Sequence, residues 1–230
     1  MESQKPIIVS VGGSLIVPGE IDTNFLTHLK NLIVKELKKG QRFVIITGGG
    51  KICRKYQEAA NAVTPLAKDD LDWLGIHSTR LNAHLVRSIF YEYAYPVIIT
   101  NPDEVLDVPK NQKLIIAAAY RPGSSTDLRA VQIASHLGSN TVVNLSNIDY
   151  AYTKDPNKYD DAEPIKETDW KTFRSLLPEE WDPGLSAPFD PIAAREAERL
   201  GLEAVIMNGN KIEEFDKYIS GESFIGTVVK

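Results

Sequence analysis

Two short apolar segments of this chain each run directly into a cluster of glycines. IIVSV at 7–11 is followed by GGS at 12–14, and FVIIT at 43–47 is followed by GGG at 48–50. Glycine lets backbone N–H groups approach an anion closely, and the start of a following helix adds partial positive charge. Two such loops predict two phosphate-bearing ligands, which is the arrangement that phosphoryl transfer requires.

Two cations follow the second glycine cluster, on the first turn of a predicted helix. The Arg54 guanidinium can form a bidentate, charge-assisted bond to phosphate, worth about 1.5–3 kcal/mol. Lys51 either contacts a ligand or is a solvated cation. A tight turn that needs positive φ is the alternative explanation for the glycines themselves.

Polar residues interrupt the apolar pattern of a helix predicted over 68–86. The carboxylate of Asp72 can accept hydrogen bonds from both hydroxyls of a ribose, and Thr79, Arg80 and Asn82 lie further along the same segment. An amphipathic helix with a solvated polar face explains the same pattern without a ligand.

Two further loops carry polar side chains where strands end. Ser124, Ser125 and Thr126 precede a helix, and Asp127 on its first turn can orient a base or a cation, although helix capping alone explains the motif. In the loop at 144–156, Tyr152 either stacks on a nucleobase or packs over a proline. The acidic residues at 155, 160 and 161 form a charge run that we interpret as solvated.

Composition limits the class of protein. A chain of 230 residues, 43% hydrophobic and 25% charged, can form one large domain with a well-filled core, or at most two small ones. Its net charge of −5 argues against a nucleic-acid partner. The single cysteine, Cys53, excludes an intramolecular disulfide, and no Cys/His spacing for zinc is present. No apolar run reaches the roughly 18 residues that span a bilayer. We therefore expect a cytoplasmic protein with no membrane partner.

Strands and helices alternate along the chain. Nearly continuous apolar runs rich in Val and Ile predict strands that are buried on both faces of a parallel sheet, at 7–11, 42–47, 97–100, 114–119, 141–145 and 203–207. Caps and terminal glycines predict helices over about 22–40, 126–138 and 190–201, with a short one near 169–177. This order predicts an α/β protein, a three-layer α/β/α sandwich with a mainly parallel central sheet. The polar stretch at 153–191 is predicted to form surface loops, and SFIGTVVK at 223–230 an edge hairpin turning at Gly226.

The common nucleotide-binding motifs are missing from the sequence. It has no GxxxxGK[ST], no GxGxxG after the first strand, and neither HRD nor DFG. A P-loop kinase, a Rossmann dehydrogenase and a protein kinase are therefore disfavoured.

Taken in order, the segments resemble the amino acid kinase family and, within it, the archaeal type of uridylate kinases. The resemblance extends over nearly the whole chain: GGS at 12–14, GGGKICRKY at 48–56, DWLGIHSTRLNA at 72–83, RPGSSTD at 121–127, NIDYAYTKDP at 147–156, FDPIAARE at 189–196 and GTVV at 226–229. It implies ATP-dependent phosphoryl transfer to UMP, with Mg²⁺ on the nucleotide and no metal site built by protein side chains alone. It also implies a homo-oligomer, a hexamer built as a trimer of dimers.

The resemblance also implies roles for individual residues. One domain spans 1–230, with an acceptor-binding part at about 1–120 and an ATP-binding part at about 121–230. The residues implied at the transfer centre are Asp127, Gly13 and Ser14, with Lys51 a candidate cation. Those implied around the acceptor are Gly48, Gly49, Gly50, Arg54, Asp72, Arg80 and Thr126. Those implied around ATP are Gly12, Ser146, Asn147, Tyr152, Asp155 and Pro156.

The chain departs from the family pattern at three places. Many members carry a lysine two residues before the first glycine pair, where this chain has Ser10, so that the cation must come from Lys51 or the metal. A Gly-Gly pair is replaced by Ala118 and Ala119, and an Asp-Gly pair by Asp149 and Tyr150. These changes leave two alternatives open: a kinase of the same fold for another phosphate or carboxylate acceptor, and a non-catalytic nucleotide- or anion-binding homologue.

Overall fold

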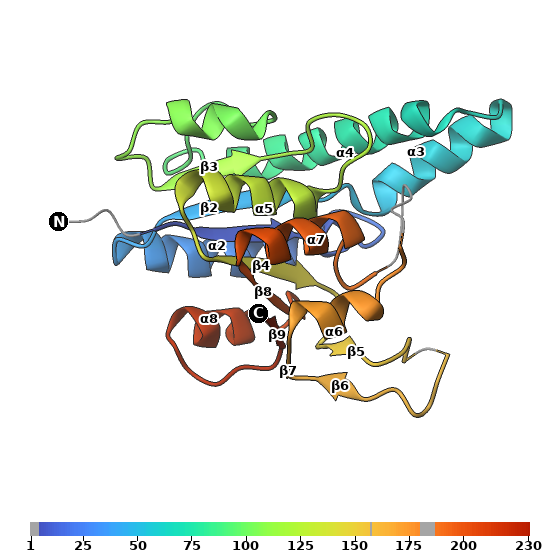
Figure 1. Cartoon of the computed structure of the whole chain (residues 1–230). Helices are drawn as coiled ribbons and strands as arrows, with labels where there is room; N and C mark the ends of the chain where they lie inside the picture. The colour runs from blue at the N-terminus through green and yellow to red at the C-terminus, as the bar shows by residue number, and fades with distance from the viewer. Residues whose placement is uncertain (1–4, 157, 180–186) are drawn as a thin grey trace.

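A computed structural model of the protein describes residues 5–156, 158–179 and 187–230, and Figure 1 gives its element labels. The strands are β1 Ile7–Val11, β2 Phe43–Thr47, β3 Leu114–Ala117, β4 Thr141–Ser146, β5 Ala151–Tyr152, β6 Pro164–Ile165, β7 Glu167–Thr168, β8 Glu203–Asn208 and β9 Thr227–Val229. The helices are α1 Gly13–Ile16, α2 Thr23–Lys38, α3 Gly50–Val63, α4 Lys68–Ile89, the 3₁₀ helix η1 Pro102–Asp107, α5 Thr126–Leu137, α6 Trp170–Ser175, α7 Pro191–Leu200 and α8 Ile212–Ile219.

The central sheet has seven strands in the order β3-β2-β1-β4-β8-β9-β7. The first five strands in this order run parallel, while β9 is antiparallel to β8 and parallel to the short β7. Parallel strands joined by crossover helices are buried on both faces, which explains their continuous apolar runs. The predicted mainly parallel sheet is confirmed.

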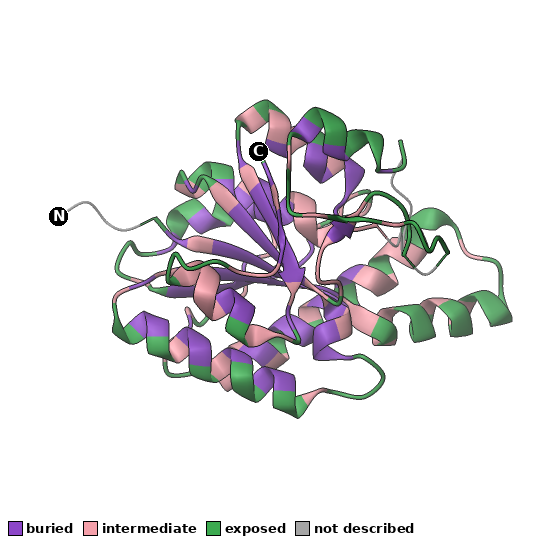
Figure 2. Ribbon diagram, turned by 90° about the horizontal axis from the view of Figure 1, so that it is seen from below, coloured by how far each residue is buried: buried purple, intermediate pink, exposed green. Residues whose placement is uncertain are grey.

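Helices cover both faces of this sheet. On one face α2, α4 and α8 bury Leu29, Val86 and Phe215 against Val9 and Ile45. On the other, η1, α5, α6 and α7 close the second core over the alternate strand residues. Figure 2 shows the buried strands between helices whose outer faces are exposed. The predicted three-layer α/β/α sandwich is confirmed.

The predicted helix ends are confirmed where side chains cap them. Asp22 accepts from Phe25 N at the start of α2, and Asp169 and Asp190 cap α6 and α7 in the same way. Gly138 ends α5 at φ 65°. Such caps satisfy backbone groups that the helix itself leaves unpaired.

Two sequence expectations about strands are wrong. Residues 97–100 form no strand: Ala94 and Ile99 make only isolated parallel bridges to β3, and Pro96 between them has no N–H to give a ladder. The C-terminal segment is not an edge hairpin, because β9 lies between β8 and β7. Gly226 is needed for close packing instead, since a Cβ there would lie 2.9 Å from the Ile206 carbonyl oxygen. Part of the expected loop at 153–191, residues 157 and 180–186, lies outside the described residues.

Candidate active site

The two glycine loops pack backbone against backbone. A Cβ on Gly13 would lie 1.9 Å from Gly50 N, and one on Gly48 would lie 2.5 Å from Gly13 N. No side chain fits at that separation, so the loops that follow β1 and β2 form one continuous surface. The two predicted phosphate loops therefore lie side by side.

Not every amide of these loops is available to a ligand. Gly12 N donates to the Leu145 carbonyl oxygen at 2.8 Å, and Gly48 N donates to that of Val11 at 2.9 Å. Within the two loops, at 12–14 and 48–50, the N–H groups of Gly13, Ser14, Gly49 and Gly50 donate no backbone hydrogen bond to the described residues. These four amides are the ones in the two loops that remain available to a phosphate group.

A cavity of about 270 Å³ opens beside the second loop, beyond the carboxyl ends of the parallel strands. It brings together predicted residues from three separate segments: Gly49, Gly50, Arg54, Asp72, Thr126 and Asp127. Ligands of open parallel sheets bind at this end of the strands. Arg54 supplies positive charge at one wall, and the carboxylates of Asp72, Asp127 and Asp190 also line the cavity, so it suits a polar, phosphate-bearing ligand.

The Asp72 carboxylate is tied to the opposite wall of this cavity. Its Oδ2 accepts a hydrogen bond from Gly123 N at 2.8 Å. Burial raises the pKa of Asp72, and the Gly123 bond partly opposes that rise. This bond links α4 to the loop before α5.

Asp127 lies among uncharged donors and next to a second carboxylate. Its Oδ1 accepts from Ser10 Oγ at 2.9 Å and from Asn144 Nδ2 at 3.4 Å, and its Oδ2 accepts from Asp190 N at 3.3 Å. Burial raises the pKa of Asp127 to about 6, opposed by the Ser10 bond and assisted by the charge of Asp190. No cation partners this carboxylate within the described residues, because Ser10 stands where the resemblance implies lysine.

Several predicted residues lie elsewhere. Lys51 is exposed and does not line the cavity. The Arg80 guanidinium is also outside it: Nη2 donates to the Tyr120 carbonyl oxygen at 2.9 Å and Nε to that of Ala119 at 3.3 Å. Arg80 therefore holds the loop after β3 rather than lining the acceptor cavity.

The sequence marks Thr79 and Asn82 as polar residues of a predicted helix but does not reveal that they support the loops. Asn82 Nδ2 donates to the Gly48 carbonyl oxygen at 2.7 Å, and Thr79 Oγ1 accepts from Ala119 N at 3.1 Å. Both side chains are buried in α4. In the sequence, each of them is a polar residue within an otherwise apolar helical pattern. A helix with a solvated polar face explains that pattern equally well. Asp190, read only as a helix cap, also lines the cavity.

The residues expected around ATP do not line this cavity. Ser146 ends β4 and Asn147 follows it, exposed. Tyr152 in β5 packs edge-on against Tyr150, with ring centroids 6.5 Å apart. The pair Asp155–Pro156 is exposed as well.

Tyr150 and Ala118–Ala119 replace glycines of the family without backbone strain. No non-glycine residue of the described chain has positive φ. Ala119 lines the cavity with its methyl group in place, so the substitutions are accommodated at these positions.

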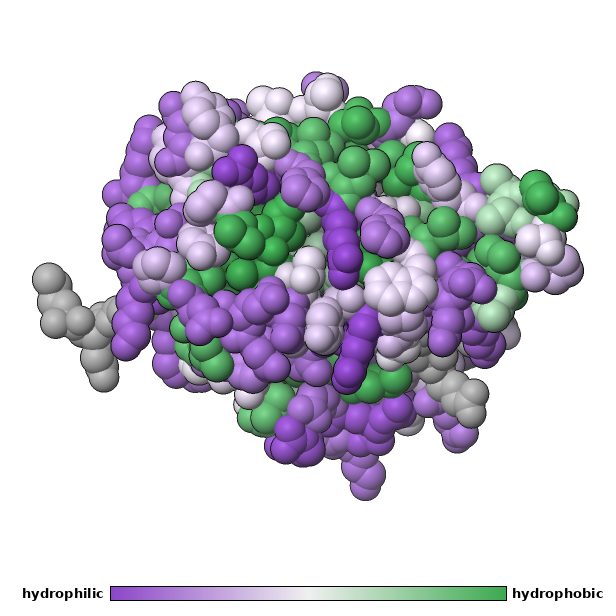
Figure 3. All heavy atoms as spheres, turned by 90° about the horizontal axis from the view of Figure 1, so that it is seen from above, coloured by the Kyte–Doolittle hydropathy of each residue, from purple (hydrophilic) through white to green (hydrophobic). Residues whose placement is uncertain are grey.

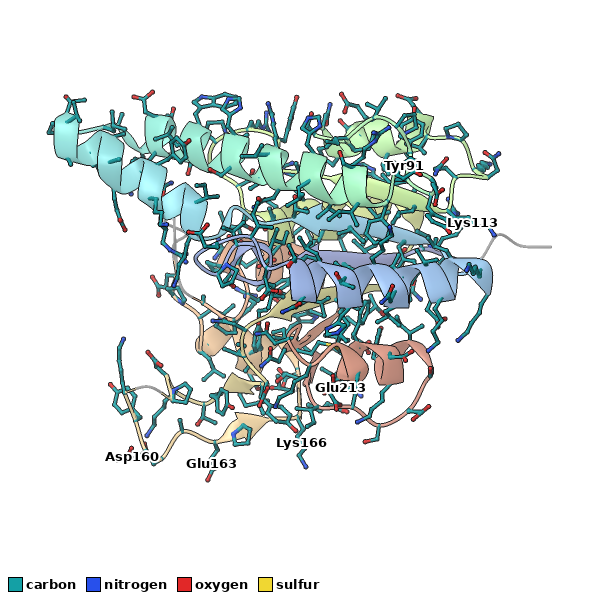
Figure 4. The ribbon with its side chains drawn as sticks, turned by 180° about the vertical axis from the view of Figure 1, so that it is seen from behind. Tyr91, Lys113, Asp160, Glu163, Lys166 and Glu213 are labelled. Atoms are coloured by element: carbon teal, nitrogen blue, oxygen red, sulfur yellow. The ribbon has the colours of Figure 1, made fainter. Side chains whose placement is uncertain are left out.

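Charged side chains on the outer loops confirm the interpretation of the acidic run at 155–161 as solvated. Lys158 pairs with Asp155 and Lys154 with Asp161 at the surface. Asp160 points away from the body of the protein at the edge that also carries Glu163 and Lys166 (Figure 4).

No group of three or more His, Cys, Asp or Glu side chains that could hold a metal occurs in the described ranges. None of the helices there is both long and apolar enough to cross a membrane.

A parallel sheet with two touching glycine loops and an arginine–carboxylate cavity at its carboxyl end defines an α/β protein built to bind phosphate groups. The model of the amino acid kinase family matches residues 5–208. The chain belongs to the amino acid kinase family.

Individual members of the family are similar to this chain over nearly its whole length. The protein is 33% identical to "Uridylate kinase" of Staphylothermus marinus over 224 residues, 97% of both chains. It is 32% identical to "Uridylate kinase" of Methanobrevibacter smithii, over 97% of this chain and 98% of the relative. The crystal structure of uridylate kinase from Archaeoglobus fulgidus shares the fold with a TM-score of 0.83 at 23% identity, covering 98% of this chain and all of that one.

Proposed function

We propose that the protein is an ATP-dependent UMP kinase, which transfers a phosphoryl group from ATP to UMP and releases UDP and ADP. One observation carries the proposal: Arg54, Asp72, Thr126 and Asp127 line one cavity beside two contacting glycine loops. The full-length similarity to proteins named uridylate kinase supports it. The enzyme is a nucleoside monophosphate kinase of the amino acid kinase family.

In this proposal Arg54 binds the UMP phosphate and Asp72 accepts from its ribose hydroxyls. The free amides of Gly13, Ser14, Gly49 and Gly50 neutralise charge on the phosphoryl group in flight. Such transfer needs positioning and charge stabilisation more than covalent chemistry, and here both reactants are held at one sheet edge. The attack is in line, from a UMP phosphate oxygen on the γ-phosphorus, and forms no covalent enzyme intermediate.

We further propose that the ATP-binding half is the part from about residue 121 onward and that Ser146, Asn147, Tyr152, Asp155 and Pro156 border the nucleotide there. The carboxylates of Asp127 and Asp190 are oxygen donors of the kind that magnesium prefers, so they fit Mg²⁺ carried by ATP. Magnesium bound there supplies positive charge to the phosphates. A cytoplasmic location is consistent with a free cysteine and with both nucleotide substrates.

We also propose a homo-oligomer in which α3 and α4 form a contact between copies. No residue of α3 is buried in the single chain. Tyr56, Val63, Trp73 and Leu81 on these two helices are large exposed apolar side chains. Figure 1 shows α3 and α4 projecting beyond the sheet, and Figure 3 shows apolar atoms at their projecting end. A long helix without a fully buried residue, and with large exposed apolar side chains, is suited to packing against a partner surface.

A coupled assay of ADP release tests the proposed activity. UMP, CMP, isopentenyl phosphate and acetylglutamate are supplied as acceptors with ATP and Mg²⁺. We expect turnover with UMP well above that with the other three. No turnover with UMP would contradict the proposal, and thermal stabilisation by nucleotides without UDP formation would favour a non-catalytic nucleotide-binding protein.

A further inference from the structure

A second cavity, of about 470 Å³, adjoins the acceptor cavity. Side chains from η1, α5 and α7 and from the loop after β3 line it. Arg121 lines both cavities, so the two sites share one cation. Apart from Arg121, the residues that line this second cavity have no role in the proposed transfer reaction.

A buried guanidinium forms part of its wall without a carboxylate on it. Arg129 is only 4% exposed, and its Nη1 and Nη2 donate to Gln132 Oε1 and Ser124 Oγ, both at 2.5 Å. Its Nε is buried and has no hydrogen-bond partner among residues 5–156, 158–179 and 187–230. A buried charge held only by neutral groups is costly unless a counter-charge is supplied.

A second guanidinium increases that cost. The guanidinium carbon Cζ of Arg121 lies 5.7 Å from the centroid of the Tyr120 ring, and that of Arg129 lies 5.5 Å from the same centroid. Burial lowers the pKa of Arg129, and the charge of Arg121 lowers it further, while Asp103 opposes this in part. Two like charges share one aromatic ring here.

The acidic side chains of this cavity are already engaged. Glu196 binds Arg199 through two hydrogen bonds of 2.8 and 2.6 Å, and Asp103 lies 3.1 Å from His136 Nε2. Neither forms a hydrogen bond with Arg129. The guanidiniums of Arg121 and Arg129 are therefore left to an external anion.

We propose that this second cavity binds a phosphate group, held between Arg121 and Arg129. Guanidinium is the side-chain group best matched to phosphate oxygens, through paired charge-assisted hydrogen bonds. The ligand is either free phosphate or pyrophosphate, or the phosphate end of a nucleotide. The site is separate from the one in which UMP is proposed to react.

Calorimetry with the first site blocked tests the inference. The full-length protein is saturated with a bisubstrate analogue that joins adenosine to uridine through five phosphates, and pyrophosphate is then titrated in. We expect one further site per chain. Arg129→Gln should weaken pyrophosphate at least 10-fold, and Arg174→Gln, which removes an exposed arginine of α6, should leave its affinity unchanged. Parallel titrations with ADP distinguish the two possible ligands. If ADP binds more tightly than pyrophosphate, the ligand is a nucleotide; if the two bind equally, the site recognises the phosphate groups alone.

The design separates this inference from the proposed function. If the analogue does not bind, the kinase assignment is wrong, and the second site is then read from the difference between the wild-type protein and Arg129→Gln with pyrophosphate alone. If Arg129→Gln does not fold, Arg121→Gln, at an exposed position, replaces it with the same expected loss. Absence of a further site, or equal affinity in the wild-type protein and the arginine variants, would overturn the inference.

Discussion

At the level of single residues, Ser10 leaves the buried carboxylate of Asp127 with a hydrogen bond but without an ion pair. The hydroxyl of Ser10 donates one hydrogen bond to the carboxylate but brings no positive charge. The pKa of Asp127 therefore stays near 6 instead of being held low by an ion pair. A carboxylate with this pKa titrates in a range where kinase activity is measurable, and its protonation state can be tested.

We expect kcat/KM, which reports the free enzyme, to fall as pH is lowered through about 6, because protonation removes the negative charge of Asp127. Asp127→Asn should lower kcat much more than it weakens either nucleotide, since its proposed role is at the transfer centre. Steady-state kinetics between pH 5 and 9 check both expectations. Unchanged turnover in Asp127→Asn would remove this residue from the transfer centre.

The same substitution should change stability in the opposite direction. The folded-state pKa of about 6 lies above the ordinary 3.8, so the folded protein binds the proton more tightly than the unfolded chain. The stabilisation from Asp127 is therefore present below about pH 4 and lost as pH rises through 6. Asn cannot ionise, so the variant should gain about 1–3 kcal/mol relative to wild type between pH 4 and pH 8. Urea unfolding at both pH values measures this, with Asp160→Asn at the surface as the control.

Arg54 offers the clearest test of the acceptor side. Arg54→Ala should weaken UMP about 10- to 100-fold, the loss expected for one charge-assisted phosphate contact, and should change ATP binding little. Lys51→Ala, three residues earlier and outside the cavity, is the matched control and should leave UMP affinity nearly unchanged. Equal losses for UMP and ATP in Arg54→Ala would contradict its placement on the acceptor.

The sequence was informative for residues with chemistry of their own and less so for those that act through a neighbour. Arg54, Asp72 and Asp127 could be selected because charge beside a glycine loop or a helix start has few uses. Arg80 and Asn82 were ambiguous, because a polar group on a helix that donates to a distant carbonyl looks the same in sequence as one facing solvent. Only the packing of α4 against the glycine loop distinguishes the two.

At the level of elements, the contact between the two glycine loops positions the site. Gly13→Ala would place a methyl carbon 1.9 Å from Gly50 N and 2.6 Å from the backbone of Gly48 and Gly49. The loops must separate to admit it, so we expect a loss of about 1–3 kcal/mol in unfolding free energy and a large fall in kcat. Gly19→Ala, where a Cβ meets nothing within 4 Å, is the matched control. Thermal unfolding and UMP turnover check the pair; wild-type behaviour of Gly13→Ala would show that the loops need not touch.

Elements with strong local signals were predictable from sequence. The caps Asp22, Ser125 and Asp190 and the terminal Gly138 and Gly201 mark helix ends through their own backbone or side-chain bonds. The order of strands at the C-terminal edge was not predictable, because β9 is placed between β7 and β8 by pairings far apart in the chain. Pro96 likewise reduced an apolar run to isolated bridges.

At the level of the whole molecule, the exposed face of α3 and α4 predicts assembly. Tyr56→Glu should lower the oligomeric state, because burying a carboxylate at an apolar contact is unfavourable. Tyr159→Glu, which alters an equally exposed tyrosine on the opposite loops, should not. Sedimentation velocity distinguishes them. A monomeric wild-type protein, or an assembly indifferent to Tyr56→Glu, would contradict α3 as the contact.

The presence of the second cavity could not be foreseen from sequence. Arg121 and Arg129 are eight positions apart, and each alone reads as an ordinary loop or helix arginine. Only the fold places both on the ring of Tyr120 and directs the nearby carboxylates to other partners. The number of copies in an assembly is likewise a property of surfaces that a single sequence does not encode locally.

Because Arg121 borders both cavities, anions in the two sites should oppose each other. Two phosphate groups compete for the charge of one guanidinium, so saturating pyrophosphate in the second cavity should weaken UMP several-fold. Thermodynamic linkage requires UMP to weaken pyrophosphate in the second cavity by the same factor. Pyrophosphate can also enter the acceptor cavity itself, and calorimetric UMP affinities in Arg129→Gln measure that direct competition alone. The coupling is the difference between the two proteins in how much pyrophosphate weakens UMP binding. If pyrophosphate weakens UMP binding equally in the wild-type protein and in Arg129→Gln, the two cavities act independently.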